Sequence, residues 1–156
     1  MRSTLLLIML WASFVCHAQS YKLFTTDEDL SSSLINHIYQ DSNGMIWVAT
    51  EDGLNRYDGA KFTTYKHNPE DAHSISHNYV RRIFEDSKGH IYIGTHNGVQ
   101  VYNPATDTFS EKAILENDRP YNQSITDIIE RNNGEVWVAG YRTGKIEIDG
   151  DKLRLT

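Results

Sequence analysis

A pattern of glycine, aromatic and aliphatic residues recurs along this chain at a spacing of 45 positions. Five positions match between the first and second copies, namely Ile38, Asp41, Gly44, Trp47 and Gly53 in the first and Ile83, Asp86, Gly89, Tyr92 and Gly98 in the second. A third copy continues at the same spacing with Ile128, Gly134 and Trp137. Its last glycine, Gly144, is displaced by one residue, which we interpret as an insertion in a loop. A period of this length, with a glycine and an aromatic residue in each unit, is typical of β-propeller blades.

Each copy reads as four short strands, because runs of β-branched and aromatic residues are separated by turn sequences such as Asp-Ser-Asn-Gly and Asp-Gly. The predicted strands are 34–40, 45–50, 54–57 and 61–65 in the first copy, 80–84, 90–95, 99–102 and 108–112 in the second, and 125–130, 135–140, 145–148 and 152–155 in the third. A β-sandwich also uses short strands. The regular phasing of whole four-strand units favours propeller blades instead.

The predicted fold is therefore all-β, a partial propeller of three four-stranded antiparallel blades plus one N-terminal outer strand. The predicted segments are a signal peptide at 1–18, the N-terminal outer strand and its connection at 19–33, and blades at 34–78, 79–123 and 124–156. The outer strand is placed at Tyr21 to Thr26, because Phe24-Thr25-Thr26 resembles Phe62-Thr63-Thr64 at the end of the first blade. Three blades are fewer than the four to eight of a closed ring, so we expect exposed sheet faces and marginal stability or self-association.

The N-terminus predicts export. Met1 and Arg2 precede an apolar run from Leu5 to Val15 that is too short for a membrane span and suits a secretory signal peptide cleaved after Ala18. The mature chain would be periplasmic, would lose the single cysteine, Cys16, and would have no disulfide. No other segment is apolar enough to insert into a membrane.

The charge balance argues against nucleic acid as a partner. The chain has 15 basic and 21 acidic side chains and a net charge of −6, which becomes −7 when Arg2 is removed with the signal peptide. Such a surface repels a phosphate backbone.

Specificity is expected in the loops, because the loops differ between copies while the strands agree. Aromatic faces and planar donors suit a small soluble ligand such as an oligosaccharide or extended peptide. The candidate ligand-binding residues are His96, Asn97, Tyr121, Tyr141 and Arg142. The alternative is that each is an ordinary exposed loop side chain.

Three loop histidines raise the question of a metal site. His67, His73 and His77 are spaced six and four residues apart, with Glu70 and Asp71 nearby, but they form no compact ligand motif. We predict solvated loop histidines, no metal, no cofactor and no catalytic residues, since no nucleophile and base constellation can be selected from the spacing.

The stretch from Asp41 to Asp58, with its pattern Asp-x-x-Gly-x-Ile-Trp-Val-Ala-Thr-x-x-Gly-Leu-x-x-Tyr-Asp, resembles the two-component regulator propeller repeat. The resemblance extends from Leu34 to about Asp149, and it weakens in the third copy, which has Arg131 for the aspartate and Gly140 for the threonine. It implies the periplasmic input domain of a hybrid two-component sensor, in which signal transduction proceeds by phosphorelay and the signal is often a glycan fragment.

The kinase and receiver domains that follow the propellers in that family have no counterpart in these 156 residues, so the resemblance implies a sensory module without enzymatic activity. Two alternatives remain at this point. The chain could be a structural module that associates with remaining propeller blades or with other copies of itself. It could also be a metal-assisted propeller lyase, because antibiotic-linearising lyases have a related blade repeat.

Overall fold

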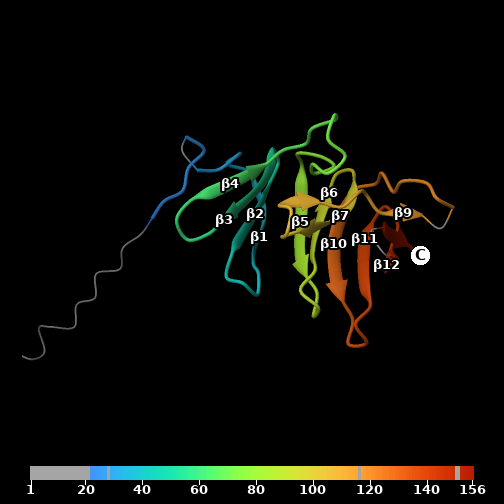
Figure 1. The fold of residues 1–156 in the computed structure, drawn as a ribbon. Coiled ribbons are helices and arrows are strands. Elements are labelled where there is room, and N and C mark those ends of the chain that lie inside the picture. The colour runs from blue at the N-terminus through green and yellow to red at the C-terminus, as the bar shows by residue number, and fades with distance from the viewer. Residues whose placement is uncertain (1–21, 28, 116, 150–151) are drawn as a thin grey trace, which may run out of the picture.

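The computed structural model describes residues 22–27, 29–115, 117–149 and 152–156, and all regular secondary structure within them is β-strand. The strands form three sheets that stand side by side in chain order (Figure 1). The signal peptide predicted at 1–18, Cys16 and Tyr21 lie outside the described residues. Within the described residues there is no helix long and apolar enough to cross a bilayer.

Four consecutive strands of each sheet form an up-and-down antiparallel meander, as expected for a propeller blade. Blade 1 comprises β1 (Ile35–Gln40), β2 (Ile46–Thr50), β3 (Gly53–Tyr57) and β4 (Phe62–Tyr65). Blade 2 comprises β5 (Val80–Glu85), β6 (Ile91–Thr95), β7 (Gly98–Asn103) and β8 (Thr108–Phe109). Blade 3 comprises β10 (Ile125–Glu130), β11 (Val136–Gly140), β12 (Gly144–Asp149) and β13 (Lys152–Leu155).

Blade 3 has a fifth strand, which the sequence did not indicate. The segment β9 (Ile114–Leu115), expected to be part of a loop, pairs in parallel with β13, so that Ile114 lies opposite Arg154. The preceding strand β8 ends earlier than predicted because the Ser110 hydroxyl accepts a hydrogen bond from the Val101 backbone N–H at 3.0 Å. A side chain thus takes the place of a ladder carbonyl. The Ala113 backbone N–H still donates to the Val99 carbonyl of β7 at 3.0 Å before the chain reaches β9 in blade 3.

The interpretation of Gly144 as displaced by an insertion is wrong. Trp47 pairs with Arg56 and Tyr92 with Val101, nine positions on in each case, whereas Trp137 pairs with Lys145, eight positions on. The third hairpin is therefore one residue shorter. Gly144 consequently occupies a strand position opposite Val138, and the positive φ angles of Gly53 and Gly98 do not recur there.

The outer strand predicted at Tyr21 to Thr26 is not formed over the described residues Lys22 to Thr26. A strand requires the edge of another sheet for its hydrogen bonds, and no edge strand in the described part of the chain pairs with this segment. Phe24 instead packs its ring on Tyr57 and Phe62, with centroids 5.1 and 5.0 Å away.

The hydrophobic core lies between blades rather than within them. Trp47 on blade 1 belongs to one buried cluster with Val80 and Ile83 of blade 2, and Tyr92 on blade 2 belongs to a second with Ile128 of blade 3. We call the face of a blade that bears this aromatic residue its forward face and the opposite face its rear face. Trp47 and Tyr92 fill the gaps between blades as predicted, whereas Trp137, on the forward face of blade 3, is only half-buried.

Candidate ligand pocket beside blade 2

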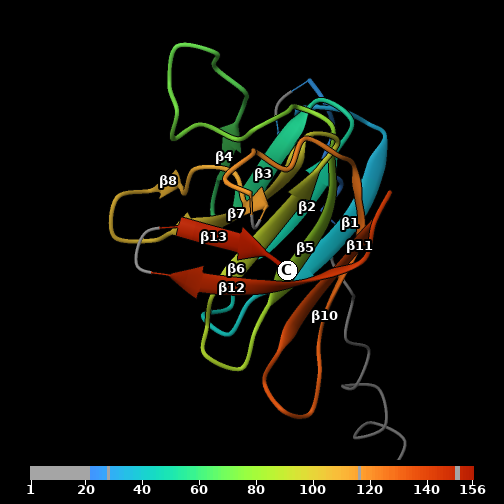
Figure 2. The same cartoon turned by 90° about the vertical axis from the view of Figure 1, so that its right-hand side faces the viewer.

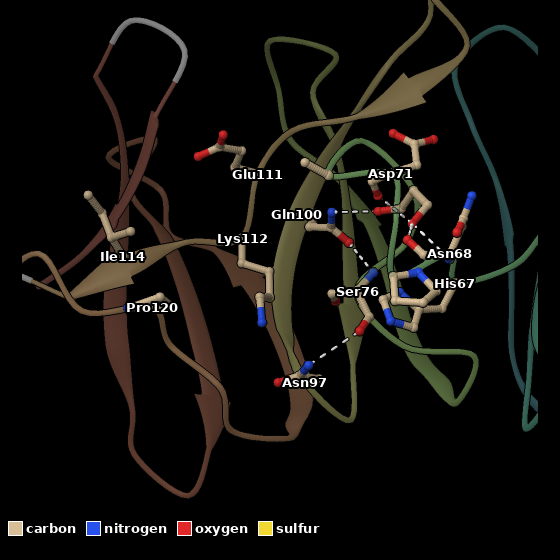
Figure 3. A pocket seen from close by; sticks show the side chains of 13 residues that line it. His67, Asn68, Asp71, Ser76, Asn97, Gln100, Glu111, Lys112, Ile114 and Pro120 are labelled. Atoms are coloured by element: carbon tan, nitrogen blue, oxygen red, sulfur yellow. Dashed lines mark hydrogen bonds between the residues drawn. The ribbon is translucent and has the colours of Figure 1, made fainter.

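A pocket of about 420 Å³ lies beside blade 2, within the size range of small-molecule sites (Figure 3). Most of its lining comes from two connections, the one from β4 to β5 and the one from Ser110 to Tyr121 that contains β9, and Asn97 and Gln100 complete it from blade 2. The first connection was expected to be a loop, whereas the second begins within the strand predicted at 108–112 and only its later part was expected to be a loop. The pocket is thus built by segments that vary between blades and are held on a regular sheet.

Gln100 on β7 fixes the first wall. Its Oε1 accepts a hydrogen bond from the Ser76 backbone N–H at 2.6 Å, and its Nε2 donates to the carbonyls of Ser74 at 3.0 Å and Ser110 at 2.7 Å. The side chain is fully buried, so these bonds hold the loop in one position in a water-poor environment (Figure 3). His67 adds a contact of 2.7 Å between its Nδ1 and the Ile75 carbonyl.

The polar groups facing the pocket carry both signs of charge. Asp71 and Glu111 supply carboxylates, and Lys112 supplies an ammonium group that donates to Asn122 Oδ1 at 2.7 Å. Asp71 uses one oxygen to accept from the His73 backbone N–H at 2.9 Å, which leaves its second oxygen for another donor. Such a lining offers hydrogen-bond acceptors and donors to a polyhydroxylated molecule.

A cluster of aromatic rings forms where His96, on the turn between β6 and β7, meets His77 and Tyr79 of the connection from β4 to β5. The His96 ring lies 4.7 Å from that of Tyr79 and 5.7 Å from that of His77, and the Tyr79 hydroxyl donates to Glu51 at 3.1 Å. Burial lowers the pKa of His77, and the neighbouring His96 and His67 rings lower it further. His77 therefore favours the neutral form next to the other two rings.

The structure brings together only two of the five predicted ligand-binding residues. Asn97 lines the pocket and donates from Nδ2 to the Ser76 carbonyl at 3.3 Å, and His96 precedes it on the same turn. Tyr141 and Arg142 occupy the corresponding turn of blade 3, are exposed, and do not line this pocket. Tyr141 is 81% exposed.

The assignment of Tyr121 to a ligand surface is wrong, because its side chain is 2% exposed and part of the core between blades 2 and 3. The residues at its position in the earlier blades, Ser31 and Ser76, bond through their hydroxyls to Thr50 and Thr95. Blade 3 has Gly140 in place of the threonine, and the Tyr121 ring packs where the smaller polar groups would be. In the sequence, the combination of Tyr121 with Gly140, in place of a serine with a threonine, was the signal that indicated this replacement.

Sequence reasoning missed Gln100, Asp71, Glu111 and Lys112. Gln100 stood out as a polar residue between two valines in a strand, at the position of Asn55 in the first copy. Asp71 lay in a loop between two predicted strands, whereas Glu111 and Lys112 lay in the strand predicted at 108–112, and nothing in the spacing showed that these two segments meet.

The three histidines considered for a metal each contact a different backbone group. His67 and His73 contact the carbonyls of Ile75 and Phe109, and His77 accepts from the Tyr79 N–H at 2.9 Å. Within the described residues, no group of three or more His, Cys, Asp or Glu side chains is arranged to hold a metal ion.

The three sheets and their repeated turns define blades of a β-propeller. The family model described as two-component regulator propeller matches residues 29–52 and 74–97, which confirms the resemblance seen in the sequence. The chain therefore carries two-component regulator propeller repeats.

Known proteins agree with this assignment. Over 56 residues, or 36% of this chain, the sequence is 50% identical to histidine kinase P4 of Formosa agariphila, of which it covers 4%. The extracellular domain of a hybrid two-component system from B. thetaiotaomicron superimposes with a TM-score of 0.71 at 27% identity over 85% of this chain and 19% of that domain.

Virginiamycin B lyase from Staphylococcus aureus also superimposes, with a TM-score of 0.58 at 20% identity over 85% of this chain and 43% of the lyase. This similarity concerns the fold alone. The chain spans about a fifth of the extracellular domain and a twenty-fifth of the kinase, and the activities of those whole proteins do not transfer to it directly.

Proposed function

We propose that this chain contributes blades to an extracellular or periplasmic sensor propeller, and that the pocket beside blade 2 binds a soluble carbohydrate. The observation that carries the ligand class is the lining of the pocket, where acidic, basic and amide side chains face one cavity of about 420 Å³. Sugars are recognised by planar polar groups of this kind together with ring faces. The extracellular origin of the similar domain from B. thetaiotaomicron supports the location.

The aromatic cluster supports the same ligand class. Tyr79 and His96 present ring faces at the turn that also carries Asn97, a residue of the pocket wall. An oligosaccharide longer than the cavity would extend from the polar pocket onto these rings. Binding at this position would contact the connection from β4 to β5, which joins blades 1 and 2, and could thereby change how the two blades are held.

The test is a screen of neutral and acidic oligosaccharides on a glycan array, followed by calorimetry with the best binder. Asp71→Asn and Glu111→Gln should each weaken binding about tenfold, because a hydrogen bond to a charged group contributes about 1.5–3 kcal/mol. Asp71→Asn keeps the oxygen that accepts from the His73 N–H, so the loop should stay folded.

Glu70→Gln is the matched control, because Glu70 lies in the same loop but does not line the pocket. It should leave the affinity unchanged. Equal affinity in all three variants would contradict the placement of the ligand, and the absence of glycan binding at millimolar concentration would contradict the ligand class.

A further inference from the structure

A second pocket adjoins the first one on the side of blade 3, and its volume of about 310 Å³ is again within the range of small-molecule sites. The two pockets share a wall, because three residues of the connection after Ser110 line both of them. Figure 3 shows this connection crossing from blade 2 to blade 3. A ligand longer than either pocket can therefore occupy both. The second pocket is lined by Glu111, Lys112, Ile114, Asp118, Lys152 and Arg154, of which the first three are shared.

Strand β13 supplies two cationic side chains to the second pocket. Leu153 and Leu155 are buried in the core, so Lys152 and Arg154, which alternate with them, face the other side of the strand. The parallel pairing of β9 with β13 places Ile114 opposite Arg154. The connection that forms part of the first pocket thus lies against the strand that supplies the cations.

The Arg154 guanidinium is held in place by two carboxylates. Its Nη1 donates to Asp118 Oδ1 at 3.2 Å and its Nε to Asp149 Oδ2 at 3.4 Å, and these hydrogen bonds raise the pKa of Arg154. They use two of the five N–H donors of a guanidinium, so three remain for another acceptor. The two carboxylates are 78% and 71% exposed, so water screens their charges. Arg154 is therefore a positioned cation with donors left for a further anion.

The two pockets differ in the sign of their charge. The first is lined by one lysine and two carboxylates, whereas the second is lined by three cationic side chains and two carboxylates. One of the two, Asp118, is paired with Arg154. Among the described residues, no carboxylate lies within ion-pair distance of Lys112 or Lys152. The second pocket therefore favours an acidic group more than the first one does.

We propose that the second pocket binds an acidic group of the ligand, so that the carbohydrate is an acidic oligosaccharide of more than one sugar unit. This inference rests on the carbohydrate pocket proposed above and narrows its ligand class. Hydroxyl groups of one unit lie in the first pocket, and a carboxylate or sulfate ester of a neighbouring unit lies at Lys152 and Arg154. The planar guanidinium suits either group, because both offer two oxygens to its paired N–H donors.

Glu111 marks the border between the neutral and the acidic part of the ligand. Its side chain lines both pockets, and it forms no ion pair with the described part of the chain. A carboxylate repels a second anion but accepts hydrogen bonds from hydroxyl groups. A hydroxyl group of the ligand is therefore expected beside Glu111, and the acidic group lies toward β13.

The test uses the whole chain on a glycan array that includes oligogalacturonates, sulfated carrageenan oligosaccharides, and the carboxyl-reduced or desulfated form of each. The tightest binder should be acidic. In calorimetry it should bind about tenfold more tightly than its neutral form, because charge-assisted hydrogen bonds are the stronger ones. This preference should shrink as sodium chloride is raised to about 0.5 M, since salt screens the charges. Whether the preferred probe carries a carboxylate or a sulfate identifies the acidic group.

Lys152→Gln tests where the acidic group lies. It should remove most of the preference for the acidic form and leave the affinity for the neutral form unchanged, because Lys152 is exposed and lines only the second pocket. Arg154→Gln should do the same, with circular dichroism to check that the strands are kept. Lys88→Gln is the matched control. It removes the same charge from an exposed turn outside both pockets and should leave the preference unchanged.

A neutral oligosaccharide as the tightest binder would overturn this inference and leave the carbohydrate pocket in place. An acidic preference that is equal in Lys152→Gln and Lys88→Gln would overturn the position of the acidic group. A single acidic sugar that binds as tightly as its oligomer would show that one pocket suffices, and would overturn the spanning ligand. The absence of binding to every oligosaccharide is a different result, because it contradicts the proposed function itself.

Discussion

A carboxylate beneath the aromatic residue recurs in all three blades, although the residue that supplies it changes. Asp41 Oδ2 accepts from the Trp47 Nε1 at 2.8 Å, and Asp86 Oδ2 accepts from the Tyr92 hydroxyl at 3.1 Å. Blade 3 has Arg131 at this position, yet Trp137 donates to Glu135 at 3.3 Å. The turn of blade 3 therefore lacks the aspartate, and Glu135 supplies the carboxylate that accepts from the aromatic residue.

Asp86 shows what this acceptor does for its own turn. Burial on its own would raise the pKa of Asp86, but hydrogen bonds from the His90 ring and from the backbone of His90 and Lys88 outweigh it and lower the pKa. The ionised carboxylate is therefore the form that the folded turn favours, and it organises the turn and the aromatic ring together.

Tyr121 provides a test of packing against hydrogen bonding. Its hydroxyl is buried without a partner in the described part of the chain, whereas that of Tyr92 donates to Asp86. Tyr121→Phe should raise the free energy of unfolding by about 1 kcal/mol, because it removes a buried hydroxyl that makes no hydrogen bond. Tyr92→Phe should lower the free energy of unfolding by about 1–2 kcal/mol, because it removes a hydroxyl that makes one. Urea unfolding measures both, and a loss of stability in Tyr121→Phe would contradict the assignment.

At the scale of the element, the innermost strand of every blade contains the same irregularity. The register shifts between Ile35 and His37 in β1, between Val80 and Arg82 in β5, and between Ile125 and Asp127 in β10. The bulge re-aims the residue that follows it. Arg82 Nε then lies 2.8 Å from Asp127 Oδ1 on the next blade, so the innermost strands are linked by an ion pair.

A serine and glutamate contact joins neighbouring blades and should contribute measurably to stability. The Glu130 carboxylate accepts from the Ser87 hydroxyl at 2.6 Å and from its backbone N–H at 2.8 Å, and Glu85 accepts from Ser42 in the same way. We expect Ser87→Ala and Glu130→Ala each to lower the free energy of unfolding, with a coupling energy of about 1 kcal/mol in the double-mutant cycle, as expected for a pair of charge-assisted hydrogen bonds near the surface. A matched cycle at Ser42 and Glu85 should give a similar value, because its distances are nearly the same. Additive losses would show that the pair does not hold the blades together.

At the scale of the whole molecule, stability is unevenly distributed. Blade 2 is covered on both faces, and its strand β6 is buried along its full length. Blades 1 and 3 are each covered on one face only within the described chain. In a repeat protein each unit is stabilised by its neighbours, so the middle blade is the most strongly held.

Hydrogen exchange should show this ranking. Amides of β6 should exchange at least tenfold more slowly than those of β2 and β11, because blades 1 and 3, each covered on one face only, open locally at a lower free energy. Mass spectrometry of peptides from each strand measures the rates. Equal protection in all three blades would show a single cooperative unit.

Much of the fold was predictable because its signals are local. The repeated glycines and the alternation of residues around Trp47 specify turns and strands, and the strand positions of blades 1 and 2 agree with prediction to within a few residues. The candidate site was less predictable. Asn97 was found because it lies in a variable turn, whereas Gln100 and Glu111 become pocket residues only when β7 and two separate connections meet.

The sequence by itself determined the blade repeat, the turns and the identity of the residues between blades, because these depend on backbone preferences and on a spacing of 45 residues. The tertiary structure decided the rest. It placed Tyr121 in the core rather than on a ligand surface and brought β9 into blade 3. These outcomes depend on how much space opposing side chains leave, and that space exists only once the blades are packed together.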